Sequence, residues 1–133
     1  MRLPKLMVVL AGVLAAGVAA AEEPTLQNVP PVVVTTVPAA GATGVSAGAT
    51  EIRVTFSKKM RPASWSWSKA SDASFPKMTG QPSYAADQKT CVLPVNLEAG
   101  KTYAIWLNLS PAENFTDEDG RKALPYLLTF STR

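Results

Sequence analysis

One stretch near the end of the chain constrains the fold more than any other. It runs from Leu97 to Leu107 and places a glycine, Gly100, ahead of six residues that read Thr-Tyr-Ala-Ile-Trp-Leu. Large apolar residues occupy every second position of that run, beginning at Tyr103. Successive side chains of a β-strand point to opposite faces. The pattern predicts a turn followed by a strand over residues 102–108, with Tyr103 facing inward and Trp106 facing outward beside Ala104 and Asn108.

The spacing Leu97-x-x-Gly100-x-x-Tyr103 resembles the corner that leads into strand F of immunoglobulin-like and fibronectin-like sandwiches. In that corner the tyrosine hydroxyl bonds to the backbone a few residues upstream, and the glycine gives the backbone the freedom that the tight approach needs. The resemblance therefore implies structural roles for Leu97, Gly100 and Tyr103. A plain hairpin turn before a strand is the alternative.

Other short segments of the chain also alternate between apolar and polar residues, and turn-forming residues separate them. No stretch of helical length shows an apolar period of 3.6 residues. The expected strands cover residues 31–37, 51–57, 64–68, 82–86, 90–95, 102–108 and 125–132. Residues 38–48 and 110–124 are expected as loops, and residues 69–79 fit no element firmly. This spacing predicts an all-β, immunoglobulin-like β-sandwich of about seven strands over residues 31–133.

The first residues of the chain have the order of a secretory signal peptide. Arg2 and Lys5 are followed by an apolar run and then by three alanines, Ala19 to Ala21. We expect cleavage after Ala21, with Ala20 as the alternative, so that residues 1–21 are a signal peptide. An uncleaved N-terminal anchor is the other possibility, although about 20 apolar residues are needed to span a bilayer. Residues 22–30, polar and punctuated by proline, are expected to form a flexible lead or spacer.

Removal of the signal peptide changes the charge of the chain. The whole sequence has 13 basic and 10 acidic residues, and both Arg2 and Lys5 leave with the signal. The remaining 11 basic and 10 acidic residues give a net charge of +1. So small an excess gives no reason to expect nucleic acid or an anionic membrane as a partner. The exported chain is expected to be extracytoplasmic, periplasmic or secreted, without a stable membrane span.

Several motifs, taken in order, resemble bacterial Ig-like domains of the S-layer-protein type. They are Val37-Pro38-Ala39-Ala40-Gly41-Ala42-Thr43-Gly44-Val45, then Ile52-x-Val54-x-Phe56-Ser57-x-x-Met60, the Asp119-Gly120 turn, and the closing Leu128-Thr129-Phe130-Ser131-Thr132-Arg133. The resemblance implies an extracytoplasmic sandwich and carries over no catalytic residue. It favours an exported, non-catalytic module that binds or scaffolds at the bacterial cell envelope, without a cofactor.

The sequence offers little for catalysis. It contains no histidine, which removes the commonest general base, and no Gly-x-Ser-x-Gly motif of a hydrolase. Its one cysteine, Cys91, shares a predicted strand face with Leu93 and Val95. We therefore expect Cys91 to be a buried, inert core residue, and we expect the protein not to be an enzyme.

A metal-handling function is the main alternative. The signal, the size and the sandwich are similar to those of the small periplasmic copper-resistance carriers, whose sites depend on His together with Met. This chain has no His, and Met60 and Met78 alone make a poor soft-metal site. The run Asp117-x-Asp119-Gly120 is similar to part of a calcium loop, but position 12 of that loop would be Leu128 instead of Glu. A solvated turn is the simpler interpretation.

The three tryptophans are the candidate ligand-binding residues. Trp65 and Trp67 lie on a strand expected beside that of Trp106 in one sheet, with the intervening serines on the opposite face. An outward Trp can stack against a sugar ring or a partner's apolar group, so the expected partner is a protein or a glycan of the cell envelope. The alternative places Trp65 and Trp67 in the core and covers Trp106 with residues 69–79, through Phe75 and Met78. The basic run of Lys58, Lys59 and Arg61 is expected to be a solvated turn.

Overall fold

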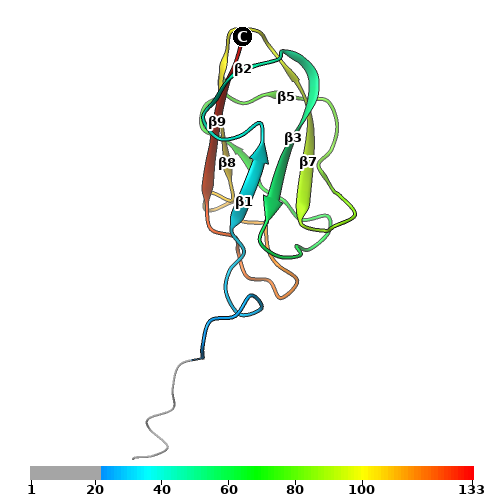
Figure 1. Cartoon of the computed structure of the whole chain (residues 1–133), viewed down its shortest axis with the longest axis vertical. Coiled ribbons are helices and arrows are strands. Elements are labelled where there is room, and N and C mark those ends of the chain that lie inside the picture. Colours follow the sequence, from blue (N-terminus) through cyan, green and yellow to red (C-terminus); the bar gives the residue numbers. More distant parts are fainter. Residues whose placement is uncertain (1–21) are drawn as a thin grey trace, which may run out of the picture.

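The computed structural model describes residues 22–133, so the expected signal peptide lies outside the described residues. Two sheets face each other (Figure 1), and one hydrophobic core lies between them. The strands are β1 (Val33–Val37), β2 (Ala42–Val45), β3 (Gly48–Phe56), β4 (Trp67–Lys69), β5 (Lys77–Met78), β6 (Ser83–Tyr84), β7 (Thr90–Leu97), β8 (Thr102–Leu107) and β9 (Tyr126–Thr132). The predicted all-β sandwich is confirmed.

The two sheets differ in strand order. The first, called sheet A here, has the order β1-β3-β7-β5, with β6 also paired to β7. The second, called sheet B, has the order β2-β9-β8-β4. Strand β2 runs parallel to β9, while the other paired strands are antiparallel. The chain therefore begins in sheet A with β1 and crosses to the edge of sheet B with β2.

The core lies between the sheets and follows the alternation of the sequence. In β8 the inward residues Tyr103, Ile105 and Leu107 are at most 1% exposed, and the residues between them are half-buried or exposed. The other strands add inward side chains in the same way. These are chiefly Ile52, Val54 and Phe56 from β3, Cys91, Leu93 and Val95 from β7, and Leu128 and Phe130 from β9. A period of two therefore accounts for most of the core.

Two local predictions were wrong. The expected loop over residues 38–48 contains β2, which the alanine- and glycine-rich composition concealed. The expected strand over residues 64–68 becomes regular only at Trp67, because the preceding residues bond to a loop instead of to a strand. Ser66, expected on the face opposite the two tryptophans, is buried as they are in part, and its hydroxyl accepts a hydrogen bond from the Asn114 backbone at 2.8 Å.

Asn108 was also predicted wrongly, on the outer face of its strand. It follows β8 with a φ of 66° and is completely buried. Its amide nitrogen donates to the carbonyl oxygens of Phe115 at 3.0 Å and Ala123 at 2.9 Å, and its side-chain oxygen accepts from the Phe115 N–H at 2.7 Å. The left-handed backbone turns the side chain away from the outer face. One side chain thereby satisfies three backbone groups of the loop over residues 110–124.

The lead and this long loop lie together at one end of the sandwich, and the C-terminus lies at the other end (Figure 1). The described residues include no helix with the length and apolar character needed to cross a bilayer.

Candidate functional site

The outer face of sheet B is the surface on which the sequence predicted a contact residue. Trp106 of β8 lies opposite Ser68 of β4 and Leu127 of β9, so these three side chains share a face. The pairs Ala104–Thr129 and Thr102–Ser131 continue the same face along β8 and β9. Within the described strands, the outward positions of these three strands are therefore Ser68, Thr102, Ala104, Trp106, Leu127, Thr129 and Ser131, and none carries a charge.

Trp106 itself is half-buried, and Leu127 beside it is 40% exposed. Phe75 and Met78, the two side chains expected to cover Trp106, lie elsewhere. Phe75 packs against the core cluster, and Met78 is 41% exposed on β5, which belongs to sheet A. The chain before Phe75 continues along the edge of β8, where the Ala104 N–H donates to the Ser74 carbonyl at 3.0 Å. This segment therefore runs beside β8 where β4 has ended.

A shallow hollow of about 180 Å³ lies at the other end of the same face. Its lining is mainly small and hydroxyl-bearing, and it consists of Gly41, Ala42, Thr43, Thr102, Thr129, Phe130 and Ser131. Thr102 and Trp106 are both outward residues of β8, four positions apart. At about 3.3 Å per residue, the hollow and the indole ring are separated by about 13 Å along the strand.

The other two tryptophans lie on the opposite side of sheet B. Trp67 pairs with the buried Leu107, and both Trp65 and Trp67 pack against the core cluster. The Trp67 ring meets the Phe115 ring edge to face, with centroids 5.8 Å apart. The three indole rings therefore do not form one platform, and of the three only Trp106 belongs to the outer face.

The corner before β8 has the geometry that its spacing predicts. Tyr103 is 1% exposed, and its hydroxyl accepts a hydrogen bond of 2.7 Å from the Glu98 N–H, five residues upstream. The Tyr103 ring also stacks on Phe130 at a centroid distance of 5.4 Å. Gly100 has a φ of 63°, which L-residues with a side chain rarely adopt, and Leu97 is buried. This corner fixes the register that turns Trp106 outward.

Cys91 lies in the core with no measurable exposure. Burial raises the pKa of its thiol to about 12. A thiol in this state is neutral at physiological pH and out of reach of solvent, so it has neither of the properties of a reactive cysteine.

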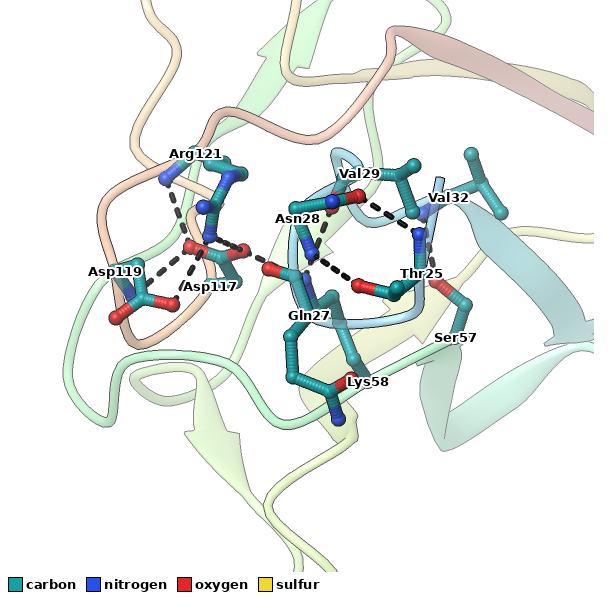
Figure 2. A network of polar contacts seen from close by, with 10 residues as sticks. All are labelled: Thr25, Gln27, Asn28, Val29, Val32, Ser57, Lys58, Asp117, Asp119 and Arg121. Atoms are coloured by element: carbon teal, nitrogen blue, oxygen red, sulfur yellow. Dashed lines mark hydrogen bonds and ion pairs between the residues drawn. The ribbon is translucent and has the colours of Figure 1, made fainter. Parts of the chain in front are cut away.

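A network of buried charges joins the lead to the long loop, and Figure 2 shows it. The ammonium group of Lys58 donates to Asp117 Oδ2 at 2.9 Å and to the carbonyl oxygens of Gln27 at 3.1 Å and Val29 at 2.9 Å. Its three N–H donors are therefore all used. The lead also closes a turn of its own, in which Thr25 and Asn28 exchange two backbone-to-side-chain hydrogen bonds. Residues 25–29 thus have defined contacts with the basic turn.

Asp117 is the centre of this network and is 1% exposed. Besides Lys58, it accepts from the backbone N–H groups of Asp119 at 3.0 Å and Arg121 at 2.8 Å. Burial alone would raise the pKa of Asp117, but the ammonium of Lys58 and these backbone donors hold it below its ordinary value. The predicted solvated turn is therefore wrong for Asp117, and for Lys58 as well.

A cavity of about 270 Å³ lies beside this network, between the lead and the two loops. Leu26, Gln27, Lys58, Lys59, Lys89 and residues 117–119 are among its lining. The lining contains both lysine and carboxylate side chains. The network and the cavity were missed at the sequence level, since Lys58 and Asp117 are 59 residues apart and no local pattern relates them.

Among residues 22–133, the side chains do not form a site that fits calcium or copper. Both carboxylate oxygens of Asp117 already accept from N–H donors, so they are not free to ligate a cation. Met60 is buried in the core while Met78 is exposed on β5. In residues 22–133 no three His, Cys, Asp or Glu side chains come together in a way that could hold a metal ion.

One solved structure with a similar fold is that of CopC from Methylosinus trichosporium OB3b. It is 17% identical to this chain, with a TM-score of 0.51, and the match covers 77% of this chain and 92% of that one. At this identity the likeness concerns the fold alone. No curated protein sequence matches the chain.

A family model settles the wider relationship. The model described as "Bacterial Ig-like domain" matches residues 27–132, which include both sheets and the corner at Tyr103. The chain therefore belongs to the bacterial Ig-like domain family.

Proposed function

We propose that this protein is an extracytoplasmic, non-catalytic binding module of the bacterial cell envelope, and that it binds its partner through the outer face of sheet B. The observation that carries the proposal is the half-buried Trp106 on a sheet face without charged side chains. Isolated apolar residues on a surface are ordinary, but an aromatic ring on a broad uncharged face is typical of a contact surface.

The chemistry of the remaining side chains supports a role without catalysis. The chain has no His, and its single thiol is buried with a raised pKa. The most enclosed charges, those of Lys58 and Asp117, are consumed by hydrogen bonds that hold two loops and the lead together. Such groups stabilise a framework and are not free to transfer protons to a substrate.

The signal-like residues 1–21 and the resemblance to S-layer-type Ig-like domains support the proposed location. In that setting the sandwich acts as a rigid support. The lead and the C-terminus lie at opposite ends of it, which suits a module that holds its binding face away from an attachment point (Figure 1).

A sedimentation assay with an envelope preparation tests the proposal. The exported protein is expected to sediment saturably with the envelopes, and the variants Trp106→Ala and Thr102→Lys are expected to lose this binding. Ala49→Lys is the matched control, because Ala49 is an exposed outward residue of β3 in sheet A. Equal retention of all three variants would contradict the proposed surface, and retention of none of the proteins, wild type included, would contradict the function.

A further inference from the structure

We propose that the ligand of this face is an uncharged polysaccharide, which lies along β8 from Trp106 to the threonine-lined hollow. This inference rests on the proposed function and names the chemical class of the ligand. It depends on three features of the face: the ring, the hydroxyl groups and the absence of charge.

The ring supplies a stacking surface. The Trp106 indole lies between Ser68 and Leu127, on the side of the sheet that faces away from the core. A pyranose ring presents a face of C–H groups with hydroxyls around its rim, so it combines an apolar surface with polar edges. The aromatic face of Trp, electron-rich and apolar, complements such a surface.

The hydroxyl groups supply the polar contacts. Thr102, Thr129 and Ser131 line the hollow together with Thr43 from β2. Each hydroxyl can donate one hydrogen bond and accept two, as the hydroxyls of a sugar do, so the two sets can pair without a fixed polarity. The separation of about 13 Å between Trp106 and Thr102 calls for an extended, oligomeric ligand rather than a single ring.

The absence of charge indicates a neutral ligand. A charged group brought onto this face would lose hydration and find no counter-charge among its outward side chains. The outer face of sheet A differs, because Glu51 and Arg53 of β3 form an ion pair of 2.9 Å there. Charge is therefore absent from the outward positions of β4, β8 and β9 and present on the outer face of β3.

A second copy of the chain suits the face less well. Stable protein interfaces bury about 1,600 Å² in total and have an apolar centre. Trp106 and Leu127 are the only large apolar side chains among the outward residues of β4, β8 and β9, and the others are Ser, Thr or Ala. Hydroxyl-rich surface of this kind suits a polyhydroxylated ligand better than a copy of itself.

Affinity electrophoresis in native gels tests the inference with defined probes. The gels contain neutral glucans, mannan and hydroxyethylcellulose, and carboxymethylcellulose serves as the charged counterpart of the last. We expect at least one neutral polysaccharide to retard the exported protein. If hydroxyethylcellulose retards the protein, carboxymethylcellulose should retard it less. Trp106→Ala and Thr102→Lys should each weaken the binding about tenfold or more, and Ala49→Lys should retain it.

The outcomes separate the ligand class from the proposed function. If no neutral polysaccharide retards the protein while envelope binding still depends on Trp106, the ligand class is wrong and the function stands. If binding to envelopes is also absent, both fail. Preferential binding of the charged cellulose, or a dimer in analytical ultracentrifugation that Thr102→Lys abolishes, would also overturn the inference. Urea unfolding of each variant verifies that it is folded.

Discussion

The loop end of the molecule and the outer face of sheet B differ in how their polar groups are used. At the loop end, Lys58 and Asp117 are largely withdrawn from solvent, and their hydrogen bonds connect three segments that are far apart in sequence. On the sheet face, Trp106 lies between Ser68 and Leu127, and the outward residues around it carry no charge. The loop end uses its polar groups to stabilise the fold, whereas the outer face of sheet B leaves its side chains available to bind a ligand.

This difference shows why the most conspicuous polar cluster is not the proposed binding surface. A buried ion pair whose donors and acceptors are all satisfied has little capacity left for a ligand. A residue that contributes little to folding can be tuned for binding without loss of stability. Substitutions should therefore affect unfolding at the loop end and binding on the sheet face.

The largest effect on stability is expected at Asp117. Asp117→Asn removes the charge that compensates the half-buried ammonium of Lys58, and losing one partner of a buried pair should cost about 3 kcal/mol of unfolding free energy. Urea denaturation measures this cost. Asp119→Asn is the control, because that exposed carboxylate pairs only with Arg121 within the network and should change stability by no more than about 0.5 kcal/mol. Equal losses of stability in both variants would contradict the claim that burial of Asp117 makes its charge important for the fold.

The corner is expected to come next. Tyr103→Phe keeps the ring that stacks on Phe130 but deletes the hydroxyl, and this leaves the Glu98 N–H without its partner. Losing the partner of this part-buried donor should cost about 1 kcal/mol or more. A denaturation midpoint equal to that of the wild type would show that the hydroxyl does not hold the corner.

Acid should weaken the loop end in particular. The pKa of Asp117 is lowered in the folded protein, so its contribution to stability is present above the ordinary pKa of about 3.9 and is lost as the pH falls through the folded value. Asp87 accepts hydrogen bonds from the Lys89 and Thr90 N–H groups, and these bonds lower its pKa as well. Its contribution to stability is therefore also lost in acid. Unfolding free energy should therefore decrease below about pH 4, and less steeply in Asp117→Asn. Identical pH profiles for wild type and variant would contradict this origin.

The smallest stability effect is expected on the sheet face. Thr102 is an exposed residue of β8 that pairs with Ser131, and Thr102→Lys should change the unfolding free energy by no more than about 0.5 kcal/mol. Ala49→Lys on sheet A should change the unfolding free energy equally little. A loss as large as that of Asp117→Asn would mean that the face belongs to the structural framework.

Sequence alone predicts the features that depend on local alternation. The strand of Tyr103 and the inward position of Cys91 follow from a period of two, and the outward position of Trp106 then follows from the corner. These features could be predicted because each depends on residues close together in the chain.

The features that escaped prediction depend on distant contacts or on an exceptional backbone. Asn108 leaves the alternation through its φ of 66°, and Ser66 is drawn inward by Asn114. Lys58 and Asp117 find each other across 59 residues, and the uncharged face exists only once β4, β8 and β9 are aligned. A linear pattern contains none of these pairings.

The most direct test of the central claim is iodide quenching of Trp106 in the variant Trp65→Phe/Trp67→Phe, where it is the remaining tryptophan. We expect iodide to quench the emission of the free protein and a saturating neutral polysaccharide to protect it, because the ligand covers the indole ring. Quenching that stays unchanged while the polysaccharide is bound would place the ligand elsewhere and contradict the role of Trp106 in binding.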